Sequence, residues 1–174
     1  KLEREQVNAR RDPLTGAPNR RAFEEMLAIE HSRVLRGGQA SGLFVVDIDR
    51  FKSINDRLGH GVGDQVLIAC FDRLVSGLRT ADIVARWGGE EITVLAPGIT
   101  TERALAQFGE RIRALVGDLP LATPKTALPV TVSVGGTLLD GSQSPGDAVR
   151  QADQAMYEAK RRRDTVVVTM PQNR

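Results

Sequence analysis

The 174-residue chain has little cysteine, few aromatic residues and almost no net charge. Its single cysteine excludes an internal disulfide bond and fits a reducing compartment. Aromatic residues make up 4% of the chain and the net charge is only +2. The chain therefore lacks the aromatic surfaces on which bases stack. It also lacks the basic surface that is typical of nucleic-acid-binding proteins. We expect no nucleic acid among its partners.

Long apolar runs are also missing. No run approaches the roughly 20 residues that span a membrane, and no secretory hydrophobic segment starts the chain. The first residue is lysine instead of methionine, which we interpret as the start of a fragment. Residues 1–11 are charged, with sparse apolar positions, and predict the end of a helical stalk or linker from an upstream sensory or regulatory region. We expect a cytoplasmic domain, in a protein that this missing region could anchor to a membrane.

What is present is the composition of one ordinary globular domain, with 41% hydrophobic and 26% charged residues. Helical periodicity and cap residues predict helices near 20–35, 50–58, 63–78, 101–116 and 145–162. Apolar runs predict strands at 42–48, 129–135 and 165–169, together with a hairpin around Gly88-Gly89. This order favours an α+β sandwich, a mostly antiparallel sheet covered by helices. The nearest simple template is the ferredoxin-like βαββαβ arrangement.

Two consecutive acids, Glu90 and Glu91, follow the paired glycines of that hairpin. Glycine takes the positive φ angles that tight turns require, so the hairpin should carry both acids to a sheet edge or tip. Adjacent carboxylates repel each other, and we expect a cationic group beside them. Paired glycines followed by acids also occur in plain turns, so this motif needs support from the rest of the chain.

A second pair of acids, Asp47 and Asp49, ends the apolar strand 42–48. Buried acids are costly unless they are hydrogen-bonded, ion-paired or bound to metal. The strand should neighbour the hairpin, which would let Asp47 face Glu90, and two such carboxylates with phosphate oxygens commonly hold Mg²⁺. The alternative is a helix N-cap. We assign the metal to Asp47 and the cap to Asp49, because Asp49 directly precedes the predicted helix at 50–58.

Four stretches of the chain resemble the GGDEF domain of bacterial diguanylate cyclases. They are DPLTGAPNRR (12–21), DIDRFKSINDRLGHGVGD (47–64), RWGGEEI (86–92) and AMYEAK (155–160). They occur in the family's order and spacing, from residue 12 to about residue 168. The resemblance implies a GGDEF domain over residues 12–174 that joins two GTP molecules into cyclic di-GMP and releases two pyrophosphates.

The resemblance also implies site residues for the metal and the reacting hydroxyl. Mg²⁺ (or Mn²⁺) would be held by Asp47, the carbonyl of Ile48 and Glu90. Glu91 would lie beside the ribose hydroxyl that reacts, either as a base or as a positioning group. All three acids are present, as expected of an active enzyme.

For the nucleotide, the resemblance assigns Lys52 and Lys160 to the phosphates and Asn55 and Asp64 to guanine. An Asp accepts hydrogen bonds from the N1–H and 2-amino groups of guanine, which adenine lacks. The residues alone favour plainer interpretations, namely a turn pair for Asn55-Asp56 and a helix N-cap for Asp64.

A homodimer and an inhibitory product site complete the expectations. One bound GTP presents one 3′-hydroxyl, whereas the cyclic product needs two new bonds, so two domains must face each other. Arg79 and Asp82 form an RxxD pattern that in the family marks a site for inhibition by cyclic di-GMP. A plain i,i+3 surface pair is the alternative. Arg111 or Arg113 could supply a further basic group.

Three residues depart from the family pattern. Ile92 replaces the usual Phe, which should change packing without loss of chemistry, and Ala17 stands where the family usually has Leu. Asp164 stands where the family has an Arg that helps to hold phosphates. This last change is the support for an alternative function, a weak or inactive domain that acts as a receptor for cyclic di-GMP or GTP. A plain dimerisation module would leave the carboxylates unexplained.

Overall fold

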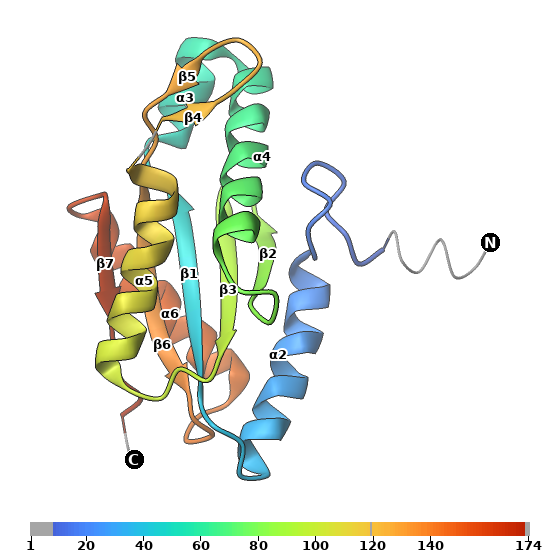
Figure 1. Cartoon of the computed structure of the whole chain (residues 1–174), viewed down its shortest axis with the longest axis vertical. Helices are drawn as coiled ribbons and strands as arrows, with labels where there is room; N and C mark the ends of the chain where they lie inside the picture. The colour runs from blue at the N-terminus through green and yellow to red at the C-terminus, as the bar shows by residue number, and fades with distance from the viewer. Residues whose placement is uncertain (1–8, 119, 173–174) are drawn as a thin grey trace.

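A five-stranded sheet forms the centre of the molecule (Figure 1). The computed structural model describes residues 9–118 and 120–172. The strand order is β2-β3-β1-β6-β7, and all neighbours are antiparallel except the parallel pair β6–β7. The bounds are β1 Ser41–Ile48, β2 Ile83–Gly88, β3 Glu91–Pro97, β6 Val132–Leu139 and β7 Thr165–Val168. The predicted mostly antiparallel sheet is confirmed.

Helices cover both faces of this sheet. They are α2 Arg20–Leu35, α3 Phe51–Leu58, α4 His60–Gly77, α5 Glu102–Gly117 and α6 Pro145–Lys160. In Figure 1, α4 and α5 lie in front of the sheet and α6 lies behind it. From β1 to β6 the chain follows the predicted βαββαβ order, and α6 and β7 extend it. The predicted stalk falls mainly on residues 1–8, which lie outside the described residues.

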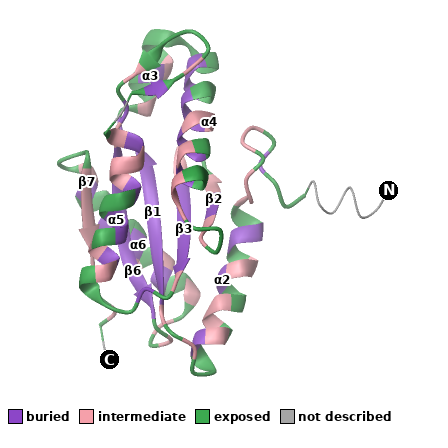
Figure 2. Cartoon of the chain, in the orientation of Figure 1, coloured by how far each residue is buried: buried purple, intermediate pink, exposed green. Residues whose placement is uncertain are grey.

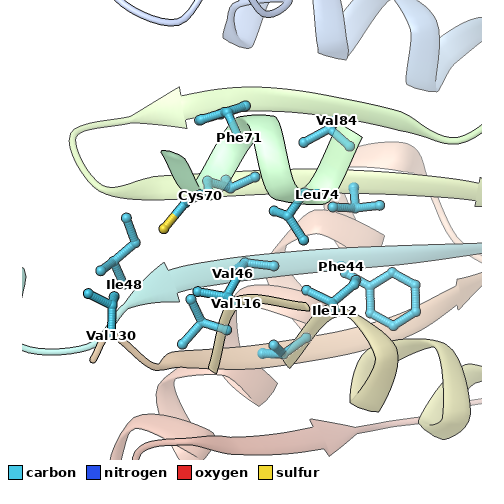
Figure 3. Packing of buried hydrophobic residues seen from close by; sticks show 14 of the residues in the cluster. Phe44, Val46, Ile48, Cys70, Phe71, Leu74, Val84, Ile112, Val116 and Val130 are labelled. Atoms are coloured by element: carbon cyan, nitrogen blue, oxygen red, sulfur yellow. The ribbon is translucent and has the colours of Figure 1, made fainter. Parts of the chain in front are cut away.

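Strand β1 separates two hydrophobic clusters. All of its residues are buried, as the continuous apolar run predicts (Figure 2). Phe44, Val46 and Ile48 pack with side chains of α4 and α5, as Figure 3 shows. Leu43 and Val45 belong to the second cluster, with residues of α2 and α6. Alternation along the strand therefore directs Asp47 to the face covered by α2 and α6.

Side-chain caps start three of the helices where the sequence predicts them. Asn19 caps α2 by accepting from the Ala22 N–H, and Thr101 caps α5 by accepting from Ala104. Ser144 caps α6 through the N–H of Asp147. These local hydrogen bonds are encoded by residues next to one another, which explains why the sequence predicts them correctly.

Other boundaries differ from the prediction. Helix α4 begins at His60 instead of residue 63, α6 ends at Lys160 instead of residue 162, and the strand predicted at 129–135 is β6. A short hairpin of β4 (Leu121–Ala122) and β5 (Ala127–Leu128) was not predicted. Within the part of the chain that the structure describes, no helix has the length and apolar character needed to cross a membrane.

Candidate functional site

Carboxylates from two remote segments meet at the end of β1. In the β1–β3 register Asp47 lies directly opposite Glu91, and the N–H of Ile48 donates to the carbonyl of Glu90 at 3.4 Å. The hairpin is thus the neighbour of β1, as predicted, but the residue opposite Asp47 is Glu91 and not Glu90. The difference arises in the turn, because Gly88 stays paired in β2 and only Gly89 has a positive φ, +52°.

Lys160 supplies the cationic group of this cluster. It is the last residue of α6, and its Nζ lies 2.9 Å from Oδ1 of Asp47, whose side chain is 4% exposed. Helix α6 approaches the sheet closely at Gly135, where a Cβ atom would lie 2.0 Å from the backbone nitrogen of Met156. Only glycine fits at that position, and this close packing brings Lys160 to Asp47.

The electrostatics of the cluster show an excess of negative charge. Burial raises the pKa of Asp47 against the opposing effect of Lys160, and the charges of Glu90 and Asp49 raise it further. Burial also raises the pKa of Glu91, as do the charges of Asp47 and Glu90. Burial disfavours the ammonium of Lys160, but its hydrogen bond to Asp47 and the surrounding acids outweigh this and raise its pKa. One ammonium does not balance these acids.

A divalent cation would correct this imbalance, and hard oxygen ligands of this kind suit Mg²⁺ or Mn²⁺. Among residues 9–118 and 120–172, no three His, Cys, Asp or Glu side chains are grouped so that they could hold a metal ion alone. A cation here would therefore need further ligands, such as a backbone carbonyl and the oxygens of a bound phosphate. The roles assigned to Asp47, Ile48, Glu90 and Glu91 stay predictions.

The assignment of Asp49 as a helix cap is wrong. The residue before α3 is Arg50, with φ +55°, and no side chain caps this helix. The carboxylate of Asp49 instead accepts hydrogen bonds from the hydroxyls of Thr131 (2.7 Å) and Ser133 (2.6 Å) and from the backbone N–H of Asp164 (2.8 Å). The position before α3 therefore predicted the wrong role for Asp49, whose partners all lie far away in the sequence.

The residues assigned to guanine lie where α3 meets α4. The Oδ1 atom of Asn55 is buried and has no hydrogen-bond partner among the described residues. A Cβ atom on Gly63 would lie 1.7 Å from it, so any side chain at residue 63 would displace the amide of Asn55. Asp64 follows at once and is exposed, as is Lys52 in the first turn of α3.

Both plainer interpretations of this region are wrong. Asn55 and Asp56 lie inside α3, not in a turn. Asp64 cannot cap α4, because the helix begins four residues earlier, at His60. An unsatisfied buried amide oxygen is uncommon in folded proteins, and its presence here is what a ligand-binding group would show.

The RxxD segment forms a turn. Oδ2 of Asp82 accepts from the backbone N–H of Arg79 at 2.8 Å, and among the described residues its carboxylate forms no ion pair with the Arg79 guanidinium. A cavity of about 640 Å³ lies beside both residues. Arg111 reaches this end of the molecule and donates to the carbonyl of Gly77 at 2.5 Å. Arg113 points elsewhere, toward Glu110, Asp118 and Asp164.

Two features beside the hairpin were missed from the sequence. The guanidinium of Arg20 lies 4.3 Å from the ring centroid of Trp87, at one end of a cavity of about 550 Å³ that Glu91 also lines. Arg86 donates to the carbonyl of Gly89 and pairs with Asp12 at 2.9 Å. The contacts Arg20–Trp87 and Arg86–Asp12 join residues far apart in the chain, which local sequence patterns do not reveal.

Comparison with known proteins places this geometry in a family. The family model described as "Diguanylate cyclase, GGDEF domain" matches residues 9–165. Diguanylate cyclase DgcP of Pseudomonas aeruginosa is 44% identical over 160 residues, which are 92% of this chain and 24% of that protein. The chain spans 36% and 42% of the next two relatives. It is therefore less than half as long as these curated proteins.

Solved structures show the same fold. The coiled coil and GGDEF domain of DgcB from Caulobacter crescentus, in complex with cyclic di-GMP, matches with a TM-score of 0.87 and 31% identity, covering 97% of this chain and 90% of that one. Diguanylate cyclase SiaD of Pseudomonas aeruginosa, in complex with its activator SiaC, matches with a TM-score of 0.86 and 39% identity, covering 97% of this chain and 65% of that one.

Proposed function

This chain belongs to the diguanylate cyclase GGDEF domain family, and on that premise we propose that it condenses two GTP molecules into cyclic di-GMP. The observation that carries the proposal is the cluster of Asp47, Glu90 and Glu91, for which Lys160 is the only neighbouring cation among the residues that the structure describes. A metal-bound triphosphate is a ligand that such a cluster can hold, because the cation offsets the acids and the phosphates supply oxygen ligands.

Asp47, the carbonyl of Ile48 and Glu90 would hold the cation, Mg²⁺ or Mn²⁺. When bound, such an ion neutralises negative charge on the phosphates while a 3′-hydroxyl attacks the α-phosphorus. Glu91 accepts a hydrogen bond from that hydroxyl and orients it. Its raised pKa, caused first by burial, also makes it a better proton acceptor than an exposed glutamate.

The rest of the nucleotide would lie along α3 and the start of α4. Lys52 and Lys160 bind phosphate oxygens. Asn55 and Asp64 hydrogen-bond the edge of guanine, and the unpaired Oδ1 of Asn55 gains a partner there. A buried acceptor left without a donor penalises the wrong base, so ATP should be rejected.

The reaction requires two copies of the domain that face each other, since each contributes one GTP and one attacking hydroxyl. The specific rate should therefore fall as the enzyme is diluted below the dimer dissociation constant. Product bound at Arg79 and Asp82, beside the cavity of about 640 Å³, would inhibit the enzyme. Arg is suited to guanine or phosphate, and Arg111 is the nearer of the two further candidates.

Incubation with GTP and Mg²⁺, followed by chromatography, tests the proposal. The wild type should yield cyclic di-GMP and two pyrophosphates, Glu90→Gln should yield almost none, and Glu158→Gln, a change at an exposed residue of α6, should match the wild type. If the wild type bound GTP or cyclic di-GMP tightly but formed no product, the receptor function would replace the enzymatic one. Equal activity of Glu90→Gln and wild type would contradict the metal site.

A further inference from the structure

The two acids that end β1 hold the α6–β7 turn at two points. Asp47 binds the ammonium of Lys160, the last residue of α6. Asp49, two residues further on, accepts from the backbone N–H of Asp164, just before β7. Because both acids belong to the same short segment, the backbone of residues 47–49 sets the distance between the two contacts.

The carboxylate of Asp49 is itself firmly held. The residue is 5% exposed, and its two oxygens accept from Thr131, Ser133 and Asp164 at 2.6 to 2.8 Å. Its own N–H donates to the carbonyl of Thr131 at 2.9 Å. These contacts join β1, the start of β6 and the turn into one unit. A buried carboxylate that accepts hydrogen bonds from three donors is held in one place.

The turn needs this support. Arg163 and Asp164 both have positive φ angles, +59° and +44°. Such conformations are unfavourable for residues other than glycine and persist only where surrounding contacts fix them. The N–H of Asp164 is fixed by Asp49, and its side chain pairs with Arg113 of α5 at 2.7 Å. Without the carboxylate of Asp49, the backbone N–H of Asp164 would lose its buried hydrogen-bond acceptor.

We propose that Asp49 is a positioning residue that fixes Lys160 beside the phosphate-binding cluster by anchoring the turn that follows it. The proposal rests on the proposed function, since Lys160 is taken to bind the phosphates of GTP. Asp49 does not touch the nucleotide; it acts through the backbone between residues 160 and 164. Thr131 and Ser133 take part by orienting its carboxylate.

A double-mutant cycle separates positioning from a general structural role. The affinity for a non-hydrolysable GTP analogue with Mg²⁺ is measured by calorimetry in the wild type, Asp49→Asn, Lys160→Met and the double variant. Each single change should weaken binding about tenfold, the value of one charge-assisted contact. The double variant should bind no more weakly than Lys160→Met alone. Effects that multiply, or wild-type affinity in Asp49→Asn, would overturn the proposal.

Asp140→Asn is a matched control. Asp140 also accepts from a backbone N–H and a hydroxyl, those of Ser142, at 2.9 and 2.6 Å, but it is exposed and lies beyond β6. Its change should leave binding at the wild-type value. If Asp49→Asn does not fold, Ser133→Ala removes one donor and keeps the carboxylate. Ser133→Ala should weaken binding of the GTP analogue when Lys160 is present and should have no effect in the Lys160→Met background. Weaker binding in the Lys160→Met background as well would refute the positioning role.

A second readout does not depend on nucleotide. The chain has four lysines, so NMR of lysine-labelled protein resolves the side chain of Lys160. In the wild type it should be restricted, and in Asp49→Asn it should become as mobile as the exposed Lys125. An unchanged, restricted Lys160 would overturn the positioning role. A wild type that binds no GTP would instead refute the proposed function, and the NMR comparison would still decide the role of Asp49.

Discussion

Replacement of Lys160 by Met should destabilise the fold by an amount that depends on pH. The change removes the ammonium that lies 2.9 Å from Asp47 and leaves that carboxylate buried without its cation. Removing one partner of a fully buried pair costs about 3–5 kcal/mol, and an exposed pair contributes about 0–1 kcal/mol. Asp47 is 4% exposed but Lys160 is 37% exposed, which places this pair between the two limits. We expect a loss of about 1–2 kcal/mol in the free energy of unfolding at pH 7.5.

The pH dependence follows from the direction of the Asp47 shift. Burial already raises the pKa of Asp47 above its usual value, and loss of Lys160 removes the contact that lowers it. An acid with a raised pKa binds its proton more tightly in the folded state than in the unfolded state. The contribution of Asp47 to stability is therefore largest at low pH and falls as pH rises from the unfolded pKa, about 3.9, through the folded pKa. The loss of unfolding free energy in Lys160→Met should therefore be smaller at pH 4.5 than at pH 7.5.

Urea unfolding at the two pH values measures this difference. Trp87 is the only tryptophan, so its fluorescence reports on the region beside the hairpin. Lys125→Met serves as the control, because Lys125 is exposed and lies far along the chain from the cluster. Equal losses at both pH values, or a loss no larger than that of the control, would refute the electrostatic reasoning.

Three further changes probe the rest of the site. Glu91→Gln should lower kcat by about 10²–10⁴-fold and keep the affinity for GTP, because a general base or orienting carboxylate is lost. Normal turnover of this variant in steady-state kinetics would count against the role of Glu91. Arg79→Ala should abolish tight binding of cyclic di-GMP and spare turnover, and unchanged binding by calorimetry would exclude the inhibitory site. Arg86→Met should cost about 1–3 kcal/mol of unfolding free energy, since it frees the Gly89 carbonyl and Asp12. Burial raises the pKa of Asp12, but hydrogen bonds from Thr15 and Arg86 outweigh burial and lower it. The loss of unfolding free energy in Arg86→Met should therefore be complete above pH 4 and smaller below it. Unfolding measured at pH 3 and at pH 7 tests this difference.

Local signals in the sequence account for most of the fold. Asn19 and Thr101 cap helices through N–H groups three residues away, and the run at 42–48 has the continuous apolar character of a strand buried on both faces. The hairpin follows from its glycines and flanking apolar runs. Once these elements are in order, few topologies remain, and the βαββαβ arrangement is one of them.

The parts that were not predicted depend on contacts between distant residues. The partners of Asp49 lie 82, 84 and 115 positions away, so the sequence could offer only the local interpretation, a helix cap. Gly61 and Gly63 look like helix breakers, yet α4 includes both, and Gly63 leaves the space that the amide of Asn55 occupies. The strands β4 and β5 are too short for any periodicity to reveal.

Joint binding of Mn²⁺ and nucleotide tests the central claim most directly. Electron paramagnetic resonance of Mn²⁺ with a non-hydrolysable GTP analogue reports whether acids from β1 and from the hairpin hold one cation that also carries the triphosphate. We predict that the wild type binds Mn²⁺ tightly only when the analogue is present, and that Asp47→Asn and Glu90→Gln each abolish this binding. Undiminished Mn²⁺–nucleotide binding in both variants would contradict the account.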